Sequence, residues 1–137
     1  HVIHRRQRQM CIRDSNQPIY LKGINFVSLC EHHLLPFTGL VNIAVYPNSK
    51  IAGVSKFSEL VNILSNNLTL QETLTKNIAI EIQNALDPKG VMVKISANHM
   101  CSSLLNIENS QTDFETTYST GIYEIDHTLR NEAMLNF

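Results

Sequence analysis

Two groups of side chains in this 137-residue chain are suited to chemistry: the block Cys30-Glu31-His32-His33 and, far along the sequence, His99 with Cys101. Cys30 and His33 are three residues apart, a spacing that lets both side chains reach one cation from a turn. Thiolate sulfur and imidazole nitrogen suit zinc, a borderline-soft ion that prefers a tetrahedron of ligands. The first expectation is therefore a zinc site on Cys30, His33 and Cys101.

Three protein ligands would leave the fourth position of the metal open for water, which is typical of catalytic zinc and not of structural zinc. Zinc lowers the pKa of such a water towards about 7 and so supplies hydroxide at neutral pH. His32 and His99 would flank the metal as proton carriers. The residues alone leave a second interpretation open, in which each Cys is a small buried hydrophobic residue and the His pair belongs to a polar loop.

Four segments are expected to be strands that position these side chains: residues 19–29, 39–46, 91–97 and 114–123. Gly23 interrupts the first of them and predicts a bulge. In the third, every second residue from Val91 to Ala97 is apolar. If this alternation continues, His99 and Cys101 lie on the same face and point to one place.

Two segments, 55–65 and 70–86, carry apolar residues at the spacing of one helix face, and a short helix is expected over 126–135. Thr69 and Glu72 predict a capping box at the start of the second helix, which gives Glu72 a structural role. The order strand, strand, helix, helix, strand, strand predicts an α+β fold: one antiparallel four-stranded sheet with two helices on one face. Its exposed edges favour a homo-oligomer.

Composition and charge narrow the function classes. Residues 1–15 hold four of the 11 basic and one of the 12 acidic residues, which leaves 7 and 11, a balance of −4, for residues 16–137. We interpret residues 1–15 as a non-native or disordered leader and residues 16–137 as a single catalytic domain. Its acidic balance argues against a nucleic-acid partner, and no apolar run approaches the roughly 20 residues of a membrane helix. Three widely spaced Cys suit metal binding in the reducing cytoplasm.

At the residues suited to chemistry, the chain resembles the GTP cyclohydrolase I family. The resemblance covers about residues 19–123, and its blocks stand in the family's order and at its separations. These blocks are Cys30-Glu31-His32-His33 with Leu34 and Pro36-Phe37, then Gly53-Val54-Ser55-Lys56, Leu70-Gln71-Glu72 with Leu74-Thr75, His99 with Cys101, and Thr116 to Gly121.

The resemblance implies the tunnelling fold, with subunits joined edge to edge into barrel rings and two rings stacked as a decamer. It implies zinc-dependent hydrolysis of the guanine imidazole ring of GTP, with release of formate and formation of 7,8-dihydroneopterin triphosphate for folate or pteridine biosynthesis. By residue, it implies zinc on Cys30, His33 and Cys101, acid-base catalysis by His32 and His99, binding of the guanine edge by Gln71 and Glu72, and binding of the phosphates by Ser55 and Lys56.

The chain departs from the family where phosphate is bound. The family has Arg three residues after the phosphate Lys, where this chain has Glu59, and Arg-Gly where it has Leu105 and Asn106. The family also usually has basic residues just before the Gln71-Glu72 block, where this chain has Ser65-Asn66-Asn67. A triphosphate favours Arg ligands, so weak affinity for GTP or a substrate with a different tail is expected. The alternative function is a non-catalytic or altered-substrate purine- or pterin-binding relative.

Overall fold

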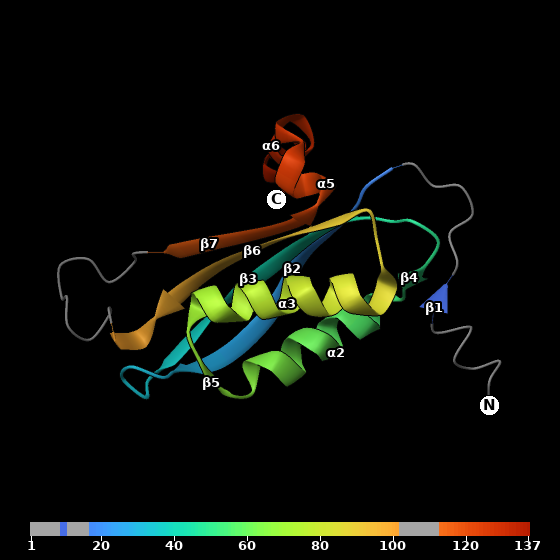
Figure 1. Ribbon diagram of the computed structural model, residues 1–137. Coiled ribbons are helices and arrows are strands. Elements are labelled where there is room, and N and C mark those ends of the chain that lie inside the picture. Colours follow the sequence, from blue (N-terminus) through green and yellow to red (C-terminus); the bar gives the residue numbers. More distant parts are fainter. Residues whose placement is uncertain (1–8, 11–16, 102–112) are drawn as a thin grey trace, which may run out of the picture.

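The computed structural model describes residues 9–10, 17–101 and 113–137, and a five-stranded sheet forms the centre of this part of the chain (Figure 1). Its strands, in spatial order, are β5 (Leu68–Thr69), β2 (Ile19–Cys30), β3 (Pro36–Tyr46), β6 (Gly90–His99) and β7 (Phe114–Gly121). The four long strands pair antiparallel, which confirms the four predicted strands. The prediction of four strands missed the short strand β5, which pairs parallel with Leu29 and Cys30 of β2 and makes the sheet mixed. Two residues are too short to show a strand period.

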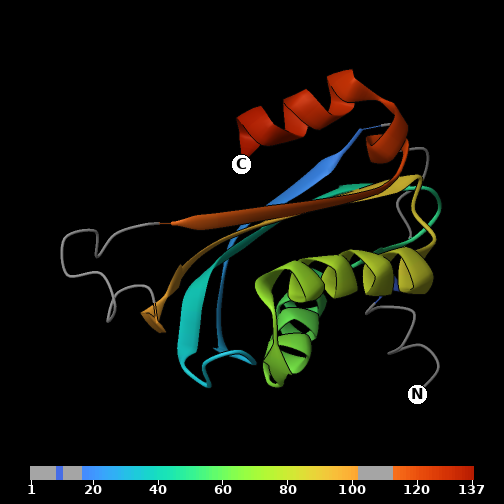
Figure 2. The ribbon, with the colours of Figure 1, turned by 60° about the vertical axis from the view of Figure 1, so that its left-hand side comes forward.

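Two helices, α2 (Val54–Ser65) and α3 (Gln71–Leu86), cover one face of the sheet, as predicted (Figure 2). Apolar side chains at helical spacing turn towards the sheet and most of them are buried there, because burial removes their apolar surface from water. The main core is formed by these helix residues and by the inward residues of the central strands, among them Phe57, Val61, Leu74, Ile78, Ile82, Val41, Ile43, Val93 and Ile95.

The C-terminal segment covers part of the other face. Helices α5 (Ile122–Ile125) and α6 (His127–Asn136) lie across the sheet from α2 and α3 (Figure 2). They close a second cluster in which Met92, on the outward side of β6, packs with Ala44, Tyr123 and Ala133. The predicted helix over 126–135 is confirmed, whereas the predicted strand 114–123 ends earlier, because Gly121 takes a positive φ of 58° and α5 begins.

Local details confirm one further expectation and correct another. The bulge at Gly23 is confirmed by its φ of 77° and by the shift of the β2–β3 register between Leu21 and Ile24. The capping box was wrong: the N-cap of α3 is Leu70, without a side-chain cap, and the Thr69 hydroxyl donates to the carbonyl of Leu70 at 3.2 Å. Pairing with Cys30 places Thr69 in a strand instead of at the helix start.

Within the segment expected to be a leader, Gln9–Met10 form β1, which pairs antiparallel with β4 (Ile51–Ala52). The rest of that segment lies outside the described residues, and the boundary at residue 16 stays a prediction. None of the helices that the structure describes is long and apolar enough to cross a membrane.

Candidate active site

A pocket of about 580 Å³ opens where β2 and β6 end and α3 begins. It gathers seven of the nine side chains that the sequence pointed to, and leaves out Ser55 and Lys56. The residues that line it are Cys30, His32, His33, Leu70, Gln71, Glu72, His99, Cys101 and Phe114. Side chains from positions 30 to 114 therefore meet at one end of the sheet.

A tight loop between β2 and β3 presents the first block of the pocket. The Cys30 amide donates to the Leu35 carbonyl at 2.9 Å, the Leu34 amide donates to the Cys30 carbonyl at 2.8 Å, and Leu34 has a φ of 55°. Cys30 ends the strand and is buried, with 6% of its surface exposed. The loop holds His32 and His33 at the surface, with their ring centroids 6.2 Å apart.

His99, the last residue of β6, is held between two aromatic rings. Its ring stacks on Phe37 with centroids 4.6 Å apart and planes 2° apart, and it meets Phe114 edge-on at 5.6 Å. Burial lowers the pKa of His99 from its usual value, and the nearby Glu72 carboxylate opposes this shift. The neutral imidazole, the form that can accept a proton, is therefore favoured near pH 7.

Gln71 and Glu72, neighbours at the start of α3, face different surroundings. Glu72 is exposed in the first turn of the helix, where the helix dipole favours a negative charge. Gln71 is only 1% exposed, and its amide nitrogen lies within 3.2 Å of the carbonyl oxygens of Ile95 and Phe114. Its amide oxygen lies 2.7 Å from Nε2 of His99. The Gln71 side chain is thus already bonded to the protein.

Three residues that support Gln71 and His99 had no predicted role in the site. Phe37 and Thr116 belong to the blocks of the resemblance, but only the structure brings them to His99 and Gln71. Phe114 carried no signal in the sequence, because its contact depends on the pairing of β7 with β6.

The donor types at the pocket fit zinc, since two free thiols, Cys30 and Cys101, and the imidazole of His33 line the same cavity. Within residues 9–10, 17–101 and 113–137, no three His, Cys, Asp or Glu side chains lie close enough together to hold a metal ion. The assignment of zinc to these three residues stays a prediction.

Ser55 and Lys56 belong to the first turn of α2 and do not line the pocket. Helix α2 begins beside β1 and β4, whereas β5 and the end of β6 lie at the opposite end of the molecule (Figure 1). Nζ of Lys56 lies 2.8 Å from Oε2 of Glu59, so the expected phosphate ligand forms an ion pair within its own helix. Leu105 and Asn106, the other departures from the family, lie outside the described residues.

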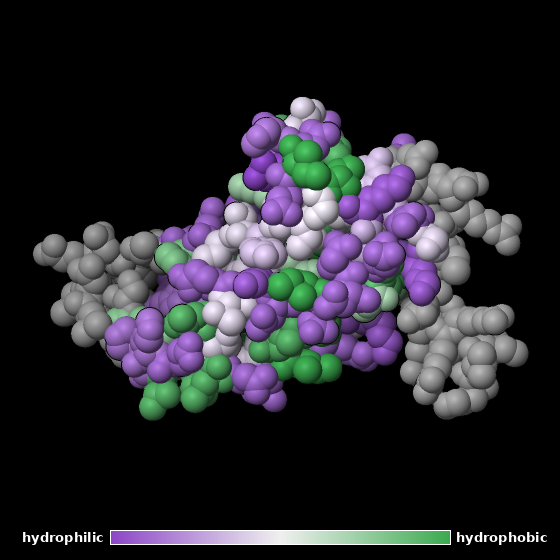
Figure 3. Space-filling model, viewed as in Figure 1, coloured by the Kyte–Doolittle hydropathy of each residue, from purple (hydrophilic) through white to green (hydrophobic). Residues whose placement is uncertain are grey.

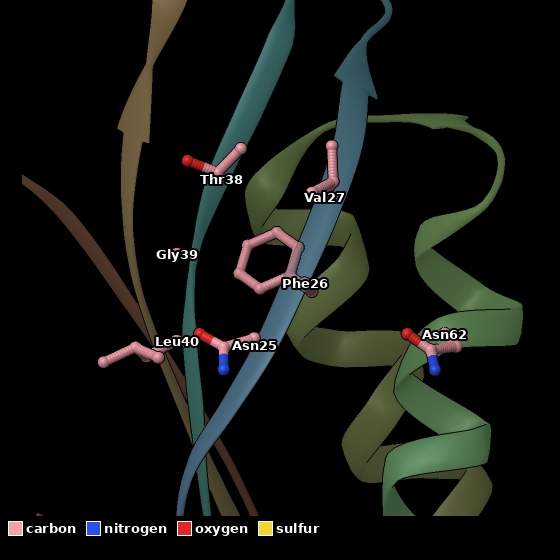
Figure 4. Close-up of a pocket in the computed structure, with 7 residues that line it drawn as sticks. All are labelled: Asn25, Phe26, Val27, Thr38, Gly39, Leu40 and Asn62. Carbon is pink, nitrogen blue, oxygen red and sulfur yellow. The ribbon is translucent and has the colours of Figure 1, made fainter.

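A second hollow, of about 480 Å³, lies against β2 and β3 and is lined by Asn25, Phe26, Val27, Thr38, Gly39, Leu40 and Asn62 (Figure 4). No acid, base or thiol is among these residues. The candidate for chemistry is therefore the pocket at the end of the sheet.

Comparisons with known proteins agree with this geometry. The family model described as GTP cyclohydrolase I matches residues 2–137. The GTP cyclohydrolase 1 of Rickettsia typhi is 47% identical over 119 residues, which are 87% of this chain and 62% of that protein. The rat enzyme of the same name is 40% identical over 121 residues, 88% of this chain and 50% of that protein. The chain thus spans less than two thirds of the length of these relatives.

Two solved structures share the fold at low sequence identity. An archaeosine synthase QueF-like protein matches with a TM-score of 0.66 and 17% identity, over 79% of this chain and 97% of that chain. Escherichia coli dihydroneopterin aldolase in complex with neopterin matches with a TM-score of 0.60 and 8% identity, over 77% of this chain and 99% of that chain. The α+β tunnelling fold is thereby confirmed.

Proposed function

Because the chain belongs to the GTP cyclohydrolase I family, we propose that it hydrolyses the guanine imidazole ring of GTP, releases formate and forms 7,8-dihydroneopterin triphosphate. The observation that carries the proposal is the single pocket that collects two thiols, three imidazoles and a carboxylate from β2, its following loop, α3 and the end of β6. The product would feed tetrahydrofolate or pteridine biosynthesis.

Cys30, His33 and Cys101 would hold one zinc ion, which would supply a Lewis acid and lower the pKa of a water molecule. Thiols that bind a metal must stay reduced, which fits the cytoplasm.

The remaining pocket residues supply proton transfer and orientation. Hydrolysis of the ring needs a base that takes a proton from water and an acid that protonates the departing nitrogen. His99, kept neutral by burial, suits the first task, and the exposed His32 suits the second. Glu72, exposed at the pocket, would accept hydrogen bonds from the ring N–H and amino group of guanine. The resemblance also assigns Gln71 to the base, but both ends of its amide are already bonded to Ile95, Phe114 and His99.

The phosphate tail would bind to Ser55 and Lys56. Neither lines the pocket of its own chain, so these residues would come from a neighbouring copy in a homo-oligomer, a decamer by resemblance to the family. A site shared between subunits is consistent with the position of the start of α2, at the other end of the molecule from the pocket.

One observation favours an altered-substrate or non-catalytic relative as the alternative. The Lys56–Glu59 pair neutralises a charge that a triphosphate needs. A substrate with fewer phosphates, or a purine or pterin that is bound and not converted, would suit this arrangement better.

The test is incubation of zinc-loaded protein with GTP, followed by measurement of formate and of the absorbance of the pteridine. Cys101→Ala should abolish zinc binding and product formation. Cys11→Ala, which removes a thiol outside the predicted set, is the matched control and should keep both.

Stoichiometric zinc without formate would reject GTP hydrolysis and support the alternative. Repeating the assay with GMP and guanosine would then separate a changed tail preference from loss of catalysis.

A further inference from the structure

The hydrogen bonds around Gln71 determine which nitrogen of His99 carries a proton. The Gln71 nitrogen lies 2.7 Å from the carbonyl oxygen of Phe114 and 3.2 Å from that of Ile95. Carbonyl oxygens only accept hydrogen bonds, so this end of the amide must be the NH₂ group. The amide oxygen therefore faces His99, and since it also only accepts, Nε2 of His99 must donate across the 2.7 Å contact.

Two threonines give the same orientation independently. The Thr75 hydroxyl donates to the backbone carbonyl of Gln71 at 2.7 Å and has no second hydrogen to give. Thr116 must then donate across the 2.7 Å contact between the two hydroxyls. Its oxygen is left as an acceptor for the Gln71 nitrogen at 3.2 Å. Every donor in this network has an acceptor, with the amide in one orientation.

Aromatic packing fixes the plane of the same imidazole. Phe37 lies parallel to the His99 ring and Phe114 meets it at 89°, so rotation of the ring would break both contacts. The ring is thus constrained by β3 and β7, and its protonation pattern is constrained by α3.

We propose that Gln71 is a positioning residue that holds His99 in the tautomer protonated on Nε2, so that the lone pair able to accept a proton is on Nδ1. The consequence for catalysis rests on the proposed function, in which His99 is a proton carrier. A histidine held in one tautomer is ready to accept a proton, whereas an unconstrained ring spends part of its time with the wrong nitrogen protonated. This role also differs from direct binding of guanine by the Gln71 side chain.

The first measurement needs neither a variant nor activity. Long-range ¹H–¹⁵N correlation spectra of histidine-labelled protein distinguish a protonated from an unprotonated ring nitrogen, and His99→Asn identifies the His99 signals. We expect a protonated Nε2 and an unprotonated Nδ1. Protonation on Nδ1, or exchange between both tautomers, would overturn the proposal whether or not the protein hydrolyses GTP.

The second measurement compares Gln71→Leu with Gln83→Leu. Gln83 is a matched control because its amide also joins α3 to β7: it donates to the Pro88 carbonyl at 3.0 Å and accepts from Thr120 at 2.9 Å, and it does not line the pocket. Gln71→Leu should mix the His99 tautomers and lower kcat on the order of 10- to 100-fold, with KM for GTP changed less than about threefold. Gln83→Leu should leave the tautomer and kcat as they are.

Other outcomes reject the role given to Gln71. A raised KM with kcat and tautomer unchanged would show that Gln71 binds the base directly. Equal losses of kcat in both variants would show that it only joins helix to strand. If Gln71→Leu does not fold, the spectra of the unmodified protein still show which nitrogen of His99 is protonated. Absence of GTP turnover with the expected tautomer would reject the proposed function and not the position of the proton.

Discussion

At the scale of single residues, the charge at position 59 bears on the proposed binding of phosphate by Ser55 and Lys56 at the start of α2. Lys56 forms its ion pair with Glu59 at a partly exposed site, where a competing phosphate would be repelled by the Glu59 carboxylate. Glu59 therefore disfavours a substrate with a highly charged triphosphate group.

We expect Glu59→Arg to lower the KM for GTP more than the KM for GMP, because it removes the competing carboxylate and adds a bidentate phosphate ligand. A decrease on the order of tenfold for GTP corresponds to one good charge-assisted contact. Glu81→Arg, an equal charge change at an exposed position of α3, is the control. It should shift the KM for GTP and the KM for GMP by the same factor. Equal effects of the two variants would contradict a specific role for Glu59.

Tyr123 is another residue whose surroundings predict a measurable effect. It belongs to α5 and is fully buried against the sheet and α6, and its hydroxyl has no hydrogen-bond partner in the described part of the chain. Because a buried unpaired hydroxyl costs about 1–3 kcal/mol, Tyr123→Phe should raise the free energy of unfolding by about 1 kcal/mol in urea titrations. Tyr118→Phe, at a half-buried position, should change it by less than about 0.5 kcal/mol. Destabilisation by Tyr123→Phe would show that the hydroxyl has a partner.

At the scale of elements, the packing of α5 and α6 on the sheet predicts a loss of stability in alkali. Burial, reinforced by Tyr20, Tyr46 and Glu132, raises the pKa of Tyr123 above its usual value of 10.0. Above about pH 10 the unfolded chain loses this proton while the folded chain keeps it, so stability present below that pH falls as the pH rises, by at most about 1.4 kcal/mol per pH unit.

Urea unfolding between about pH 9 and pH 11 measures this slope. Tyr123→Phe should flatten it, and Tyr118→Phe should not. An unchanged slope in Tyr123→Phe would mean that other groups dominate alkaline unfolding.

The contact between β3 and β6 gives a second prediction at this scale. A Cβ on Gly39 would overlap the carbonyl oxygen of Ser96 and lie 2.6 Å from Cα of Ala97, all backbone atoms that cannot rotate away. Gly39→Ala should therefore destabilise the protein by about 3 kcal/mol or more in thermal or urea unfolding. Gly53→Ala, with no atom within 4 Å of the new Cβ, should stay within about 1 kcal/mol of the unmodified protein. Similar changes in stability for the two variants would contradict the close approach of β3 and β6 at Gly39.

At the scale of the whole molecule, the sheet face opposite α2 and α3 carries exposed apolar side chains among the described residues. Val27, Leu29 and Leu40 are 63%, 45% and 43% exposed there. The other face, which α2 and α3 cover, shows hydrophobic residues in separate groups among hydrophilic ones (Figure 3). The exposed apolar sheet face opposite α2 and α3, together with the edge strands β5 and β7, fits the proposed association of several copies.

If active sites are shared between copies, two inactive variants should complement each other. His99→Asn keeps the start of α2, and Lys56→Ala keeps the pocket, so subunits mixed by partial unfolding and refolding should form some intact sites and regain activity. Each variant refolded alone is the control. No recovery in mixtures that sedimentation shows to be hetero-oligomers would mean that one chain supplies the whole site.

The sequence by itself determined the elements with a clear period and the types of the chemical groups. The alternation from Val91 to Ala97 and the apolar stripes of α2 and α3 depend on neighbours in the chain, so their faces could be predicted. The Cys and His blocks likewise indicated zinc chemistry at one pocket. The sequence could not give β5, whose two residues carry no pattern, or the capping of α3, which depends on pairing with β2.

Only the tertiary structure decided how these groups are used. The partners of Gln71 lie 24 to 45 residues away, so the commitment of its amide to β6 and β7 could not be read from its neighbours in the sequence. The same holds for Phe114 beside His99 and for the burial of Met92 beneath the C-terminal helices. Local periodicity specifies which face a side chain occupies, whereas strand pairing between distant segments specifies what it meets there.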